Sequence, residues 1–203
     1  MAYLVRFTTE PRYVPEIVFP GQSGRFLHQK YWDPRVPHRY DPAEVPRQAF
    51  LTSGNKTIPD FVPIHARWGV SPEARALIEE FEPGVHQFVP VEILRPRSGK
   101  PIHRLDGRVL DTPYYLFSVQ TLIDAVWVER SEVEISPVLG SPPSVYQVPG
   151  RWNIVLRRDL VAGHHVWRGR HHLPRDLFFS DALAREVEAR RLRKLQMHRL
   201  EEA

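Results

Sequence analysis

The chain of 203 residues contains no cysteine. That absence excludes disulfides, thiolate catalysis and cysteine-based zinc sites, and it agrees with a reducing compartment. The sequence also lacks a charged-then-apolar signal pattern at its start, and no apolar run approaches the length that spans a bilayer. We therefore expect a cytoplasmic protein with no membrane partner.

Lysine is scarce, because 24 of the 28 basic residues are arginine. The formal net charge of +4 is uneven: residues 1–150 carry 16 basic and 17 acidic side chains, and residues 151–203 carry 12 and 7. A nucleic-acid surface would produce this tilt, since phosphate contacts need clustered cations. A coding bias toward arginine and a cationic helix end explain it equally simply, and we favour that interpretation.

Hydrophobic residues make up 42% of the chain and aromatic residues 11%, which is typical of a folded protein. Twenty prolines and eleven glycines predict short elements and many loops. Residues 1–58 predict an irregular wrap, rich in proline and aromatic residues, with short strands near 16–19 and 48–52. Residues 59–203 form the remaining α+β region, and we expect both parts to make one compact unit.

Residues 69–94 contain a helical pattern of apolar residues followed directly by a strand pattern. Ser71 and Pro72 suit the start of a helix, and apolar residues then recur at helical spacing until Pro83 and Gly84 stop it. The following residues alternate in character, as in a strand with one buried face. The apolar positions of the helix are Ala74, Leu77, Ile78 and Phe81, and one face of the strand carries Val85, Gln87, Val89, Val91 and Ile93.

The order of elements predicts the fold class. We expect an α+β domain with a mainly antiparallel or mixed sheet, one mid-chain helix packed on it and a long C-terminal helix. Ser180 and Asp181 would begin that last helix, which should run to near Leu200 with a cationic second half. Further strands are expected at residues 2–7, 114–120, 121–129, 152–157 and 163–168.

Four histidines lie close together in the sequence, at His164, His165, His171 and His172. They suggest a metal site, and a His-dependent metalloenzyme is one alternative function. However, neighbours on a strand point to opposite faces, and no three ligands share a recognised zinc spacing. We therefore predict no metal, no cofactor and no catalytic residue here.

Other fragments of enzyme motifs are incomplete. Residues 53–57 (SGNKT) lack the upstream glycine and the helix of a phosphate-binding loop, and residues 21–25 (GQSGR) lack the final glycine of a nucleophile elbow. Asn55 formally begins a glycosylation acceptor, which matters only in a secreted protein. Asp106 and Asp111 flank an expected hairpin loop, where paired carboxylates are usually solvated. No enzyme signature remains, and we predict a protein without catalysis.

Nucleic-acid binding is the main alternative function. It would use the arginines of the C-terminal third, with Trp152 and Trp167 as stacking partners. No known nucleic-acid module matches the order of elements, and tryptophans on strands are more often core residues. The cationic candidates are Arg157, Arg158, Arg168, Arg170, Arg190, Arg191, Arg193 and Lys194.

Residues 60–180 resemble a family of bacterial immunity proteins from polymorphic-toxin and contact-dependent competition systems, the immunity-protein-11-like domain. The two most specific pieces are PGVHQFVPVE at 83–92 and GHHVWR at 163–168. Weaker pieces lie in the same order as in the family: PDF at 59–61, LIEE at 77–80, YYLFSV at 114–119, IDAV at 123–126, Leu160 and FSDAL at 179–183. The chain departs from the family in its N-terminal wrap and in its basic C-terminal end.

The resemblance implies a partner rather than a substrate. Members are thought to bind and neutralise a cognate toxin protein, encoded by an adjacent gene, without catalysis. Such an interface should bury roughly 800 Å² per partner. We expect part of it to use Trp32 and Tyr40 in the N-terminal wrap; the alternative is the acidic helix face at Glu79, Glu80 and Glu82.

Overall fold

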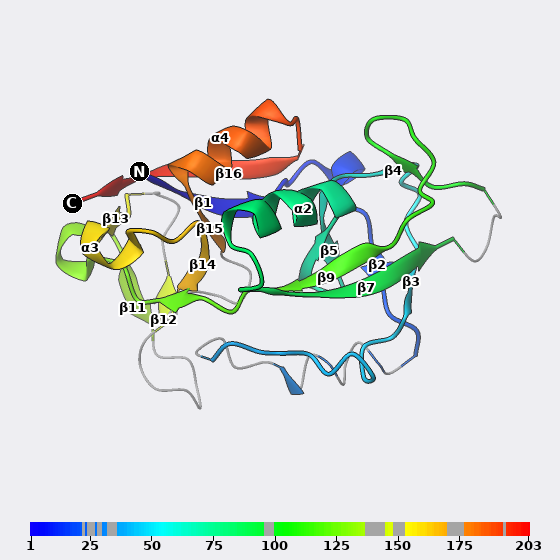
Figure 1. The fold of residues 1–203 in the computed structure, drawn as a ribbon, viewed down its shortest axis with the longest axis horizontal. Coiled ribbons are helices and arrows are strands. Elements are labelled where there is room, and N and C mark those ends of the chain that lie inside the picture. The colour runs from blue at the N-terminus through cyan, green and yellow to red at the C-terminus, as the bar shows by residue number, and fades with distance from the viewer. Residues whose placement is uncertain are drawn as a thin grey trace.

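Two β-sheets organise the chain, and the helices occupy only short stretches between their strands (Figure 1). The computed structural model describes residues 1–21, 23, 27, 30–31, 36–95, 100–136, 145–147, 153–169, 177–192 and 194–203. Strand pairs in both sheets join segments that lie far apart in the sequence. None of the helices in these ranges is long and apolar enough to cross a membrane.

A six-stranded mixed sheet forms one half of the molecule. Its central strand, β1 (Ala2–Phe7), is antiparallel to both of its neighbours. Both faces of β1 are buried, since Val5 joins one core cluster while Ala2 and Leu4 join another. In order across the sheet, the strands are β10 (Leu122–Ile123), β14 (Val166–Gly169), β15 (Leu177–Ser180), β1, β16 (Leu195–Glu202) and β13 (Val155–Leu156).

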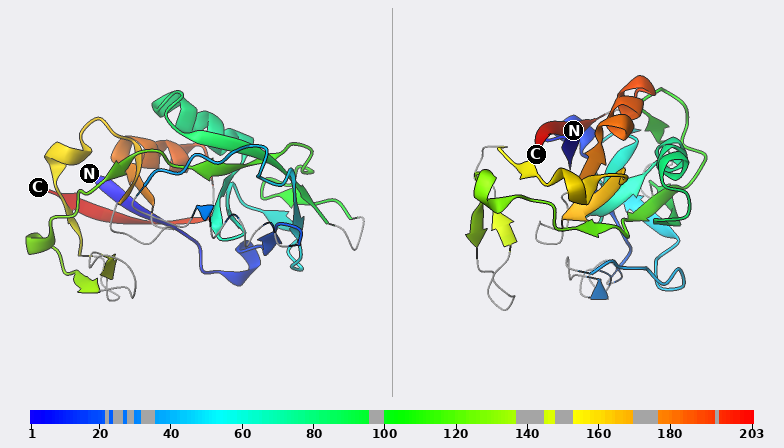
Figure 2. Two further views of the ribbon diagram at one scale, coloured as in Figure 1. Left: turned by 90° about the horizontal axis from the view of Figure 1, so that it is seen from below. Right: turned by 60° about the vertical axis from the view of Figure 1, so that its left-hand side comes forward.

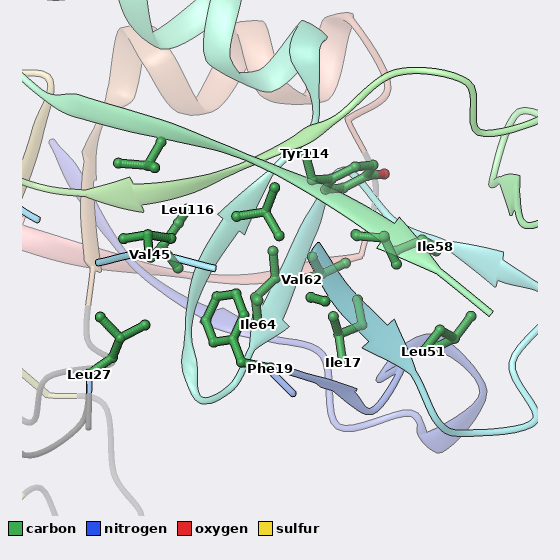
Figure 3. Packing of buried hydrophobic residues seen from close by; sticks show 14 of the residues in the cluster. Ile17, Phe19, Leu27, Val45, Leu51, Ile58, Val62, Ile64, Tyr114 and Leu116 are labelled. Carbon is green, nitrogen blue, oxygen red and sulfur yellow. The ribbon is translucent and has the colours of Figure 1, made fainter. Parts of the chain in front are cut away.

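Six other strands close into a barrel. Its interior is filled by buried aliphatic and aromatic side chains, among them Ile17, Ile64 and Leu116, which converge from different strands in Figure 3. Side chains of a small barrel fill its centre in this way, so the interior is core and not a ligand cavity. In order around the barrel, the strands are β2 (Ile17–Val18), β3 (Gln48–Leu51), β7 (Gln87–Leu94), β9 (Tyr114–Ser118), β6 (Arg67–Val70) and β5 (Phe61–Ile64).

The helices α2 (Pro72–Phe81) and α4 (Asp181–Ala189) share the core that joins the two sheets. Each is capped as the sequence predicts: Ser71 Oγ accepts from the N–H of Ala74, and Ser180 Oγ from the N–H of Leu183. The remaining elements are α3 (Arg158–Val161), the 3₁₀ turns η1 (Pro11–Tyr13) and η2 (Val128–Arg130), and the small strands β4 (Thr57–Ile58), β8 (His103–Arg104), β11 (Glu134–Ser136) and β12 (Val145–Gln147).

The α+β prediction is wrong, because the fold is β-rich, with a barrel and a second sheet, and has no long C-terminal helix. Residues 181–189 are helical, but residues 195–202 form β16, which pairs with β1 from Leu195 to Leu200. The physical reason is tertiary pairing. The weak helical periodicity beyond Ala189 is overridden by six backbone pairings and by burial of Leu200 in the core.

Several individual elements agree with the sequence. The strand at residues 2–7 and the helix at residues 72–81 are confirmed, and the short strands near 16–19 and 48–52 appear as β2 and β3. The strand expected at residues 121–129 is wrong: only Leu122–Ile123 is a strand, and a 3₁₀ turn follows at Val128–Arg130. Figure 2 shows from two further sides how β1 and β16 run together and bring the two chain ends close to each other.

Candidate partner-binding surface

The end of α4 has an unusual backbone. The N–H of Leu192 donates to Val187 O, and the N–H of Arg191 donates to Glu188 O. These two bonds define a Schellman motif, in which the residue after the cap is left-handed and is usually glycine. Here that residue is Arg191, with φ of 56°. The hydrophobic contact of the motif is also present, because Leu192 and Val187 are buried in one cluster.

We call residues 190–192 and 194 the basic turn. Lys194, at its end, is also left-handed, with φ of 76°. An L-residue in this conformation costs roughly 1–2 kcal/mol, and strained residues of this kind gather at functional sites. Two such residues three positions apart, both cationic, mark the turn as a candidate functional surface.

A cleft of about 510 Å³ lies on one side of the basic turn. Its lining combines apolar side chains with the charged residues Glu10, Glu188, Arg191 and Lys194. Lys194 Nζ lies 3.6 Å from the ring centroid of Tyr13 and 3.8 Å from Glu10 Oε1, so its charge is held over the neighbouring 3₁₀ turn. The apolar part of the lining, which we call the apolar floor, consists of Val187, Leu192, Leu195 and Met197.

A second cleft, of about 320 Å³, lies on the other side of the turn, and Arg191 lines both. Its lining includes a network of ion pairs. Arg104 donates to Glu73 Oε1 at 2.5 Å and to Asp60 Oδ1 at 3.1 Å, and Arg108 donates to Glu73 at 3.0 Å. Burial by itself would lower the pKa of Arg104, but the bond to Glu73 outweighs it and raises that pKa.

The charges of the basic turn differ in availability. Arg190 is neutralised, since it donates two hydrogen bonds to the Glu80 carboxylate, at 2.9 and 2.6 Å, and one to Glu186. Arg191 is exposed and makes no ion pair with any residue in the described ranges. Arg191 is therefore the cation of this surface that a partner meets without breaking an existing pair.

On the two surfaces expected from the sequence, several of the named side chains are buried or paired. The ring of Tyr40 is only 5% exposed, because it packs in the barrel core against Tyr31. The acidic helix face is also divided, because Glu80 is paired with Arg190 and Glu82 is buried. Trp32 lies outside the described residues.

A buried network joins the two sequence motifs that carry the family resemblance. Glu82 Oε1 accepts from the backbone N–H groups of His165 and Val166, at 2.6 and 3.2 Å. Glu82 Oε2 lies 2.5 Å from His86 Nε2. Because His86 Nδ1 accepts from the N–H of Gln120, the ring hydrogen lies on Nε2, which donates to Glu82.

This network is structural. Burial by itself raises the pKa of Glu82, but the bonds from His86 and from two backbone N–H groups outweigh it and lower that pKa. Both ring nitrogens of His86 are already bonded, so neither is available to take a proton from a substrate. The sequence did not predict the pair of Glu82 and His86. Its only signal in the sequence is a Glu four residues before a His, on the two sides of the Pro83-Gly84 pair that ends the helix.

The histidine cluster is divided by the fold. His164 is exposed, whereas His165 is half-buried, with Nδ1 2.9 Å from Ser180 Oγ and its ring against Phe81. His171 and His172 lie outside the described residues. Within the described part of the chain, no group of three His, Asp or Glu side chains could hold a metal ion.

The other sequence candidates have local roles. Residues 53–57 form a turn that leads into β4, where Ser53 Oγ accepts from the N–H of Glu16. Asp106 accepts from Arg108 Nε at 2.6 Å, and Asp111 is exposed. Of residues 21–25, only Gly21 and Ser23 are described.

The fold does not gather the arginines of the nucleic-acid alternative on one surface. Arg168 points into the interior and is 9% exposed, whereas Arg157 and Arg158 are exposed at the start of α3. Trp167 is 1% exposed and stacks on Phe178, as expected of a core residue. Trp152, Arg170 and Arg193 lie outside the described residues.

The comparisons with known proteins identify the class. Residues 9–201 match the model of the immunity protein family Imm11. The chain therefore belongs to this family of immunity proteins, as the two motifs indicated, and its role is immunity against a toxin. A search of curated proteins found no match.

Proposed function

We propose that the chain neutralises its cognate toxin in the cytoplasm by direct contact, without catalysis of its own, and that the basic turn lies at the centre of the interface. Membership of the immunity protein family supports a toxin as the partner. The single observation that carries the choice of surface is the left-handed Arg191, exposed between two clefts.

The chemistry of the turn defines the partner surface. Because Arg191 is positively charged, the toxin should place a carboxylate against it. Complementary charges speed the encounter of two proteins and disfavour wrong partners. The apolar floor beside it, which includes Leu195 and Met197, suits one aliphatic or aromatic side chain of the toxin. The toxin should therefore present an apolar residue next to acidic ones.

Stoichiometry tests the mechanism. The neighbouring toxin-like gene is expressed with and without this chain, and the purified toxin is titrated with the purified chain. Direct neutralisation predicts rescue of growth, a complex that survives gel filtration, and full inhibition only at about one chain per toxin. Full inhibition at a small fraction of that ratio, with chemically altered toxin, would show an enzyme instead, and absence of rescue and of binding would refute the proposal.

A further inference from the structure

Two arginines face each other beneath the N-terminal segment with no acidic partner among the described residues. Arg168, on β14, is nine-tenths buried; its Nη2 donates to Val36 O at 3.3 Å, and its Nε has no hydrogen-bond partner in the part of the chain that the structure describes. Arg67, on β6, donates to the backbone oxygens of Tyr31 and Leu27, at 2.8 and 3.4 Å, and to no other residue that the structure describes. Burying a guanidinium without a counter-charge is costly.

A small cavity lies between the two arginines. It has a volume of about 20 Å³, and Arg67, Arg168, Tyr40, Ser118 and His38 are among its lining residues. A cavity of this size holds one water-sized species. The position is also marked electrostatically, because burial and the like charge of Arg67 lower the pKa of Arg168, against the opposing effect of Tyr40.

The wall of the cavity is well ordered by hydrogen bonds. The segment that carries His38 and Tyr40 is fixed to β7 by two bonds with Gln87, at 2.7 and 2.8 Å. The carbonyl of His38 accepts from Gln120 Nε2 at 2.9 Å and also from Ser118 Oγ. The cavity is therefore a built feature of the barrel rim, not a gap between loops.

We propose that this cavity binds a single halide-sized anion, chloride in the cell, held by Nε of Arg168 and the guanidinium of Arg67. The anion supplies the missing counter-charge and accepts the unmade Arg168 hydrogen bond. The small volume favours a halide, which is little larger than water, over phosphate or sulfate. A neutral water would fill the space but would leave the two positive charges facing each other.

Bromide is the probe that tests the site. Crystals of the wild-type chain soaked in sodium bromide should show an anomalous peak within hydrogen-bonding distance of Arg168 Nε. In solution, chloride at ten times its dissociation constant should raise the Tm by about 3–6 °C over sodium gluconate of equal ionic strength. Arg168→Met should fold, because an apolar replacement of a buried charge is tolerated, and should lose this chloride-dependent rise.

The exposed Arg185→Met is the matched control and should keep the full chloride response, since its side chain is 72% exposed on α4. A wild-type crystal with no bromide peak at this position, or a Tm that is equal in chloride and gluconate, would overturn the proposal. The crystal measurement uses the wild-type chain alone, so the result does not depend on whether either variant folds. Neither measurement involves the toxin, so the outcome is independent of the proposed interface.

Discussion

The side chain of Glu82 binds the backbone of His165 across 83 positions of sequence. Glu82 follows the last residue of α2, and His165 directly precedes β14, so one carboxylate ties the helix that flanks the barrel to the six-stranded sheet. The two motifs that identify the family therefore meet at one buried contact, which we call the joint. Both motifs therefore contribute to the buried scaffold of the fold.

Glu82→Gln should lower the free energy of unfolding by about 2–4 kcal/mol, because a neutral amide has one acceptor oxygen for three donors. Urea denaturation measures the change. Glu79→Gln, a half-exposed glutamate on the same helix, is the control and should change stability by less than about 0.5 kcal/mol. Equal effects of the two substitutions would show that the joint contributes nothing specific.

The same residue sets part of the acid sensitivity. The pKa of Glu82 is lower in the folded chain than its unfolded value near 4.5. Its contribution to stability is therefore complete above that value and is lost as the pH falls through the lowered, folded-state pKa. Between about pH 5 and pH 3 the wild type should lose more unfolding free energy than Glu82→Gln, which denaturation curves at each pH will measure; parallel losses would contradict the assignment.

Gly69 in β6 should not tolerate a side chain. A Cβ there would lie 2.6 Å from Ile64 Cδ1 and 3.1 Å from Val62 Cγ2, and both neighbours are fully buried in the barrel. Gly69→Ala should cost about 1–3 kcal/mol of stability by overpacking. Gly54→Ala, with no atom within 4 Å, is the matched control and should be close to neutral. Thermal unfolding of the two variants side by side measures the difference.

Arg191→Gly should separate stability from binding. Glycine is unstrained in the left-handed position that ends α4, so the variant should be more stable than the wild type by up to about 1 kcal/mol. It should nevertheless bind the toxin about tenfold or more weakly, because the unpaired cation is lost. Calorimetric titration with the toxin measures the affinity, and the Tm measures the stability. The control is Arg185→Gly, inside the same helix, which should lose stability and keep its affinity for the toxin. A variant with unchanged affinity would remove Arg191 from the interface.

Sequence periodicity predicted elements whose burial follows a local pattern, such as α2 with Leu77 and Ile78, and β1. It failed where distant partners decide the structure. Residues 195–200 are a strand because β1 lies beside them, and nothing in their own composition states this. The end of α4 was not predicted for a different reason: the left-handed residue that ends the helix is arginine and not glycine.

The candidate surface could not be predicted for the same reason. The basic residues after Ala189 were visible in the sequence, but a helix would have spread them around its circumference. Their gathering between two clefts depends on the turn at Arg191 and on the return of the chain beside β1. Likewise, the sequence suggested that Arg168 is a surface cation, and only the fold shows that it lies in the interior opposite Arg67.

The pairing of Ala2 with Leu200 also sets an order of events during folding. The centre of the six-stranded sheet joins the two most distant parts of the chain, and such pairings form slowly because a long loop must close first. The basic turn directly precedes β16 and takes its shape when that strand docks. The proposed toxin-binding surface would therefore be complete only after β16 has paired with β1.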